Sequence, residues 1–121
     1  MPILPFVILK HMLQYSKELD ASFSALADPT RRAVIAHLCE QPASVSELAD
    51  QLPMSLSAVG QHLRLLEAAG LVTTEKKGRT RVCRAEPEKL AAVEAWFAER
   101  RRRTERRLDQ LEAFLEKDDT E

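Results

Sequence analysis

The start of a short helix predicted over residues 55–69 carries side chains of the kinds that contact nucleic acid. Its first turns, in the sequence SLSAVGQHL, place Ser57, Ala58 and Gln61 away from the apolar residues of the helix. The Gln61 amide can pair with N6 and N7 of adenine, the Ser57 hydroxyl can donate or accept, and the Ala58 methyl group can meet the thymine methyl. We therefore predict that these three residues read base edges in the major groove of DNA.

The residues around this helix predict how it is held in the molecule. Ser55 is a suitable cap for its first turn, and Gly70 is a suitable stop after its last. A turn over residues 52–54 separates it from a preceding short helix over residues 45–52. Four apolar residues at helical spacing are expected to form its buried stripe: Leu56, Val59, Leu63 and Leu66.

Two further helices are predicted upstream. Apolar residues recur at helical spacing from Tyr15 to Leu26, which indicates a first amphipathic helix. Asp28 followed by Pro29 is a typical helix start, and the second helix is expected to end near Cys39. This arrangement of short helices with a tight turn before the last one is typical of a helix-turn-helix.

A basic hairpin is predicted directly after the helix at residues 55–69. Strands over residues 71–76 and 80–85 flank the turn Lys77-Gly78-Arg79. A hairpin so placed is expected to contact the DNA backbone, because lysine and arginine position a protein on phosphates. The residues predicted to contact phosphate are Ser55, His62, Arg64, Lys76, Lys77, Arg79 and Arg81.

A long final helix is predicted from Pro87 to about Glu116. It carries one apolar seam, interrupted by Arg101 and Thr104, which so small a protein cannot cover by itself. Pairing with a second copy, together with the first helix, would bury this seam. The residues predicted to form the dimer interface are Leu19, Phe23, Leu90, Val93, Phe97, Leu108, Leu111 and Leu115.

These elements predict a mostly α-helical protein with a small β-hairpin: a winged helix-turn-helix with N- and C-terminal dimerisation helices. The expected divisions are residues 1–14, an arm or a wrongly assigned start; residues 15–116, the DNA-binding and dimerisation domain; and residues 117–121, an acidic tail. At 121 residues, 45% hydrophobic and 31% charged, the chain suits a single globular domain. Its net charge of −1 shows that any basic surface must be local.

Several motifs, taken together in this order, resemble the ArsR (arsenic repressor) family of bacterial transcriptional regulators. They are Leu26-Ala27-Asp28-Pro29-Thr30-Arg31-Arg32, then Glu47-Leu48-Ala49, then His62-Leu63, and finally Gly70-Leu71-Val72. The resemblance implies a homodimeric winged-helix repressor that binds a palindromic operator, with residues 55–69 as the recognition helix. It also implies that a signal releases the repressor from DNA.

The chain departs from the metal-sensing members of that family. The cysteine pair that some carry in the helix equivalent to residues 45–52 is missing, and no histidine follows His62 to build a site on the final helix. His37 and Cys39 point in different directions on their helix and supply too few ligands for zinc. No metal and no cofactor are therefore predicted. Gly60 stands where the family often has serine, which removes a hydroxyl and weakens the helix by about 1 kcal/mol relative to alanine.

Other features have two interpretations. Six arginines between Arg100 and Arg107 are expected to form a solvated, partly paired helix face, with a phosphate contact as the alternative. Cys39 and Cys83 fit a reducing cytoplasm without a disulfide, and Cys83 is expected to be a small buried side chain; a thiol switch is the alternative.

The composition and motifs favour a cytoplasmic, DNA-binding regulator without catalytic activity. No nucleophile elbow, phosphate-binding glycine loop or carboxylate–histidine cluster occurs, and the chain has only three glycines. No membrane span is expected, and the effector is unknown. Two alternatives are a winged-helix protein-interaction module and a regulator that binds a small molecule at a dimer seam around Trp96, Phe97 and Arg101.

Overall fold

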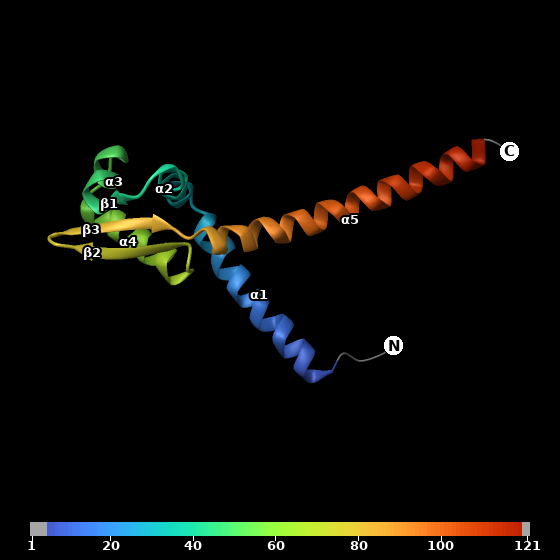
Figure 1. Cartoon of the computed structure of the whole chain (residues 1–121), viewed down its shortest axis with the longest axis horizontal. Helices are drawn as coiled ribbons and strands as arrows, with labels where there is room; N and C mark the ends of the chain where they lie inside the picture. The colour runs from blue at the N-terminus through green and yellow to red at the C-terminus, as the bar shows by residue number, and fades with distance from the viewer. Residues whose placement is uncertain (1–4, 120–121) are drawn as a thin grey trace.

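The structure, a computed structural model, describes residues 5–119, which form five helices and a small antiparallel sheet (Figure 1). The predicted winged helix-turn-helix is confirmed. In chain order the elements are α1 (Phe6–Leu26), α2 (Pro29–Glu40), β1 (Ala43–Ser44), α3 (Val45–Gln51), α4 (Leu56–Ala68), β2 (Val72–Lys77), β3 (Thr80–Ala85) and α5 (Pro87–Asp119).

Side-chain caps start the three helices of the helix-turn-helix. Asp28 accepts a hydrogen bond from the backbone N–H of Arg31 at 3.0 Å, and Ser44 accepts one from the backbone of the third helix at 3.1 Å. Ser55 accepts from the backbone N–H of Ala58, also at 3.1 Å. Each bond satisfies a donor that the first turn of a helix leaves free, so the caps predicted at Asp28 and Ser55 are confirmed.

Gly70 ends the reading helix as predicted. Its φ is 77°, in the left-handed region that glycine adopts without strain. Its N–H donates to Glu67 O and the N–H of Leu71 donates to Leu66 O, both at 2.9 Å. The chain therefore leaves α4 directly into β2, and the wing is fixed beside α4.

The sheet contains one strand more than the sequence predicts. Its strand order is β1-β3-β2, and both pairings are antiparallel. Ala43 pairs with Cys83 and Ser44 with Val82, so the residues just before α3 are bonded to the inner part of the wing. A strand of two residues has no alternating pattern to reveal it.

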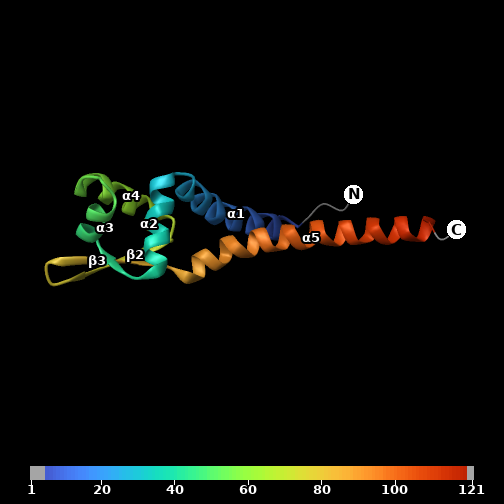
Figure 2. The same ribbon diagram turned by 90° about the horizontal axis from the view of Figure 1, so that it is seen from above.

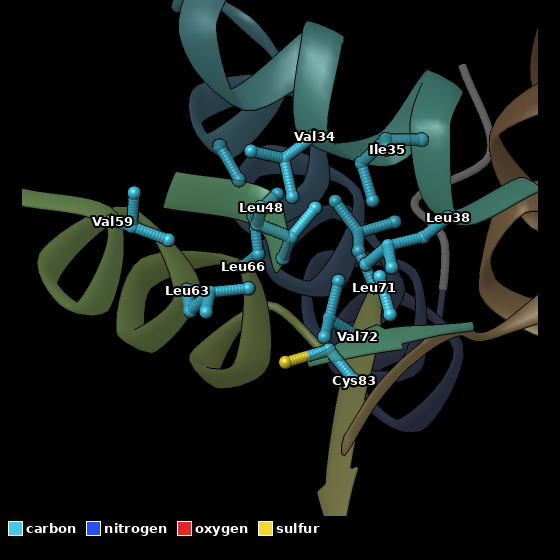
Figure 3. Packing of buried hydrophobic residues seen from close by; sticks show 12 residues of the cluster. Val34, Ile35, Leu38, Leu48, Val59, Leu63, Leu66, Leu71, Val72 and Cys83 are labelled. Atoms are coloured by element: carbon cyan, nitrogen blue, oxygen red, sulfur yellow. The ribbon is translucent and has the colours of Figure 1, made fainter. Parts of the chain in front are cut away.

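We call residues 29–85, which contain α2 to β3, the head; its core lies between the helices and the sheet (Figure 3). Side chains from α2, α3 and α4 point toward one another and toward the sheet. The largest side chains that are fully buried are Leu48, Leu66, Leu71, Val34, Val59, Val72 and Cys83. The buried position predicted for Cys83 is confirmed, whereas Leu56, expected in the buried stripe of α4, is 58% exposed because it lies in the first turn, before the helix reaches the core.

Helices α1 and α5 leave the head and diverge, and the wing and the end of α5 lie at opposite ends of the molecule (Figures 1 and 2). Near the head they are in contact: the Phe23 ring packs edge-on against Trp96 and Phe97, at centroid distances of 5.5 and 5.7 Å. Every residue from Arg100 to Asp118 is exposed, and we call this segment the rod.

Three residues predicted for the dimer interface make packing contacts within the chain itself. Leu19 is buried, Phe23 contacts α5, and Leu90 packs against the core of the head. The seam of α5 is apolar enough for a partner, but its first turns are covered by the chain's own α1. Phe97, Leu108, Leu111 and Leu115 are more than half exposed, as is Phe114, which the prediction omitted.

Two helices extend beyond their predicted bounds. Helix α1 begins at Phe6 rather than near Tyr15, so residues 6–14 of the expected arm belong to it. Helix α5 continues to Asp119, so the expected tail at 117–121 is helical as far as that residue. Residues 1–4 and 120–121 lie outside the described residues.

Candidate nucleic-acid interface

One face of α4 is polar and open to solvent, opposite the face that packs into the core (Figure 3). Ser57, Gln61 and Arg64 are exposed, while Ala58 is half-buried. Val59, Leu63 and Leu66 point inward and fix the rotation of the helix. The predicted base-reading residues therefore share the outer side of α4, with Ala58 at its edge.

The wing carries its basic residues on exposed backbone near the tip. Lys76 pairs with Arg81 across the two strands, and Lys77 pairs with Thr80, next to the turn containing Gly78 and Arg79. Within residues 5–119, no carboxylate lies within ion-pair distance of these four basic side chains. Their charge is therefore available to a polyanion.

Helix α4 and the wing are held together by a side-chain bond. The Thr74 hydroxyl donates to Glu67 Oε1 at 2.8 Å, which links β2 to the last turn of α4. One of the few acidic groups near this surface is thereby held on the side of α4 that faces the sheet. The polar face of α4 and the basic tip of the wing are together the candidate nucleic-acid surface.

His62, predicted to contact phosphate, turns toward the start of α2. Its Nδ1 accepts a hydrogen bond from Arg31 Nη1 at 3.4 Å and lies 3.9 Å from Asp28 Oδ2. The same arginine donates from Nε to Ala25 O at 2.6 Å and from Nη2 to Ser24 O at 3.4 Å, at the end of α1. No local pattern predicts a role for Arg31, although it lies in the motif at residues 26–32, three residues after the Asp28 cap.

The environment of the Asp28 carboxylate favours its charged form. The hydrogen bond from the backbone N–H of Arg31 is the largest cause that lowers its pKa below the ordinary value, and the charge of Arg31 lowers it further, against an opposing effect of desolvation. Asp28 is thus a charged cap at the point where α1, α2 and α4 meet.

The arginines of α5 lie on the helix that leaves the head. Arg100 stacks over the Trp96 ring at 4.4 Å, and Glu99 pairs with Arg102 at 3.0 Å and with Arg103 at 3.1 Å. The hydrogen bond from Arg102 is the largest cause that lowers the pKa of Glu99. The prediction of a solvated, partly paired face is confirmed for this segment.

No metal site is formed by the described residues. Among the described side chains, those of residues 5–10 and 17–118, no group of three or more histidine, cysteine, aspartate or glutamate residues could bind an ion. Cys39 is exposed and Cys83 is buried, and burial raises the pKa of the Cys83 thiol, which keeps it in its unreactive protonated form. None of the helices within the described residues is long and apolar enough to cross a membrane.

Comparison with known proteins agrees with this geometry. Residues 26–75 match a family of helix-turn-helix domains. The chain is 46% identical to the HTH-type transcriptional regulator Rv2034 of Mycobacterium tuberculosis over 74 residues, which covers 61% of this chain and 69% of that protein. It is 42% identical to the HTH-type transcriptional repressor SmtB of the same organism over 69 residues, which covers 57% of this chain and about half (51%) of SmtB.

A solved structure gives the same result. The crystal structure of an ArsR family transcriptional regulator is 47% identical, covers 74% of this chain and 93% of its own, and superposes with a TM-score of 0.69. The chain belongs to the ArsR family of winged helix-turn-helix transcriptional regulators. It is therefore a DNA-binding regulator of transcription and not an enzyme.

Proposed function

We propose that this protein is a dimeric repressor whose α4 reads bases in the major groove while its wing contacts the DNA backbone. The observation that carries this proposal is the exposed polar face of α4 beside a basic wing tip without carboxylates in ion-pair range. Ser57, Ala58 and Gln61 are the proposed base readers. The proposed phosphate contacts are Ser55, His62, Arg64, Lys76, Lys77, Arg79 and Arg81.

Two substitutions separate base reading from backbone contact. DNA sequences bound by the native chain would be selected from a random library and used as probes in fluorescence anisotropy. Gln61→Ala should lose about 1–3 kcal/mol on the selected sequence and relax the preference at one base pair. Arg79→Ala should weaken binding to all sequences alike and, because a dimer loses one arginine from each wing, reduce the slope of log affinity against log salt by about 1.8.

Arg106→Ala is the matched control, because it removes the same charge from the exposed rod. It should leave affinity and salt slope as in the native chain. If the native chain gives no salt-sensitive complex with any duplex, the protein-interaction alternative is correct and this proposal is wrong.

We also propose that the rod of α5, with the exposed start of α1, pairs with a second copy. Phe97, Leu108, Leu111 and Leu115 recur at three- and four-residue steps with Arg101 and Thr104 between them, which is the spacing of a helix–helix seam. Phe6 and Val7 at the start of α1 are likewise more than three-quarters exposed. A two-fold dimer would present two α4 helices to half-sites about 34–36 Å apart.

A charge placed in the seam tests this interface. Leu108→Glu should shift the chain to monomers in analytical ultracentrifugation, whereas Ala113→Glu, on the side of α5 away from the seam, should remain associated. If both variants associate like the native chain, the interface lies elsewhere.

Repression would follow where the operator overlaps a promoter and the bound dimer excludes the polymerase. SmtB, a relative, is named a repressor. A reporter placed under the gene's own upstream region in the cytoplasm of a bacterial host should be expressed at a lower level when the native chain is supplied. Higher expression in that assay would identify an activator instead.

A further inference from the structure

Arg31 connects three helices through a single guanidinium group. Its Nε and Nη2 atoms donate to the backbone carbonyls of Ala25 and Ser24 at the end of α1, while Nη1 donates to the His62 ring in α4. Its own backbone N–H is bound by the Asp28 cap at the start of α2. A planar guanidinium holds such divergent acceptors in a fixed geometry, which lysine cannot do.

The arginine determines which ring nitrogen of His62 carries the proton. Arginine has donors only, so Nδ1 at 3.4 Å must present its lone pair. Asp28 Oδ2 would favour a proton on Nδ1, but it lies farther away, at 3.9 Å, and already accepts the N–H of Arg31. The neutral ring therefore carries its proton on Nε2, on the side of the ring away from Arg31.

The position of the ring on α4 would allow this N–H group to contact DNA. His62 follows Gln61 directly, and its side chain is 20% exposed rather than fully buried. Backbone N–H groups and neutral side-chain donors commonly bind phosphate oxygens beside a reading helix. An Nε2–H on this partly exposed ring is a neutral donor of that kind.

We propose that Arg31 is a positioning residue that holds His62 as a neutral Nε2–H donor to a DNA phosphate beside α4. This inference rests on the proposed DNA contact of α4 and adds its chemistry: the contact is a hydrogen bond without a charge. Because a neutral imidazole carries no charge, the His62 ring contributes no counterion release of its own.

Two substitutions at His62 distinguish the roles of its two ring nitrogens. In His62→Asn, the amide oxygen replaces Nδ1 as the acceptor for Arg31, but the Nε2–H donor is lost. In His62→Gln, the longer amide replaces the Nε2–H donor. With a duplex selected by the native chain, His62→Asn should lose about thirtyfold in affinity, because the dimer loses two hydrogen bonds of about 1 kcal/mol each. His62→Gln should bind like the native chain, and the salt slope should be unaltered in both.

The positioning role is tested by coupling. In an Arg31→Met background, where the ring is no longer held, the change from His62 to Asn should cost less than twofold. Thermal unfolding of each single and double variant would show that all remain folded at the assay temperature. In an Arg31→Lys background, His62→Asn should cost more DNA affinity than in the Arg31→Met background but less than in the native chain.

The protonation state is tested by ¹⁵N NMR of the imidazole ring in the native complex. Nδ1 should give the signal of a nitrogen with a free lone pair, and Nε2 that of a protonated nitrogen. A doubly protonated ring, a salt slope that falls by about 1.8 in His62→Asn because both copies of a charged ring are lost, or native affinity in that variant would overturn the inference. A native chain that binds no duplex would instead overturn the proposed function itself.

Discussion

The head and the rod contain similar apolar side chains but differ in what covers them. In the head, leucines and valines from three helices and the sheet bury one another almost completely. In the rod, Leu108, Leu111 and Leu115 lie on a single helix and are each more than half exposed. The head is therefore defined by contacts within one chain, whereas the rod needs another surface to bury its seam. Substitutions of the same type should then act on different properties in the two regions.

The largest expected effect is the loss of a core leucine. Leu66→Ala, at a fully buried position, should lower the free energy of unfolding by about 2–5 kcal/mol, because it removes buried methyl groups and leaves a cavity. Leu111→Ala in the rod should change it by no more than about 0.5 kcal/mol in dilute protein. Chemical denaturation of both variants measures the difference. Equal losses would show that the rod is buried within the single chain.

A substitution at Gly70 tests the junction between α4 and the wing, which lies within the head. Gly70→Ala should destabilise the protein by about 1–2 kcal/mol, because a side chain is strained at a φ of 77°. The added Cβ would also lie 3.0 Å from the flexible end of Lys89, which can move. Gly78→Ala is the control, since Gly78 has a φ of 64° with open space around it. If Gly70→Ala lowers the free energy of unfolding by more than Gly78→Ala does, the difference measures the contact with Lys89.

Gly60 gives a smaller effect of the opposite sign. A Cβ at this position meets no atom within 4 Å, and the residue lies in the middle of α4. Gly60→Ala should therefore stabilise the head by about 1 kcal/mol in a denaturation experiment. Unaltered DNA affinity in the same variant would show that this position faces away from the groove, and a loss of affinity would place it in the interface.

Asp28 gives the smallest expected effect, which depends on pH. Its pKa is lowered in the folded protein, so its charged form contributes stability that is complete above the ordinary value of about 3.9. That stability is lost as the pH falls through the lowered pKa of the folded state. The difference in melting temperature between the native chain and Asp28→Asn should therefore be constant near neutrality and shrink in acid. A difference that grows in acid would contradict the charged cap.

The sequence predicts best those features that depend on a few neighbouring residues. The caps at Asp28 and Ser55 and the stop at Gly70 are local hydrogen-bond and backbone effects, and each is present. The wing is predicted within one residue, because its glycine turn lies between two strand-like runs.

Features that depend on contacts between distant residues are predicted less well. Leu19 and Leu90 have the spacing of an interface, but they are covered by the same chain. Leu56 has the spacing of a core residue, but no other part of the chain covers its side chain. Arg31 is separated from His62 by 31 residues, so no local pattern reveals that the two side chains meet.

The pairing of Ala43 and Ser44 with β3 has a consequence for exchanging DNA specificity between relatives. Because two residues before α3 complete the sheet of the wing, the helix-turn-helix and the wing share backbone hydrogen bonds as well as a core. A chimaera that transfers α4 alone would place a foreign reading helix on a native sheet. A transfer of residues 43–85 as one block carries every strand pairing with it, and is the smallest graft that keeps this sheet intact.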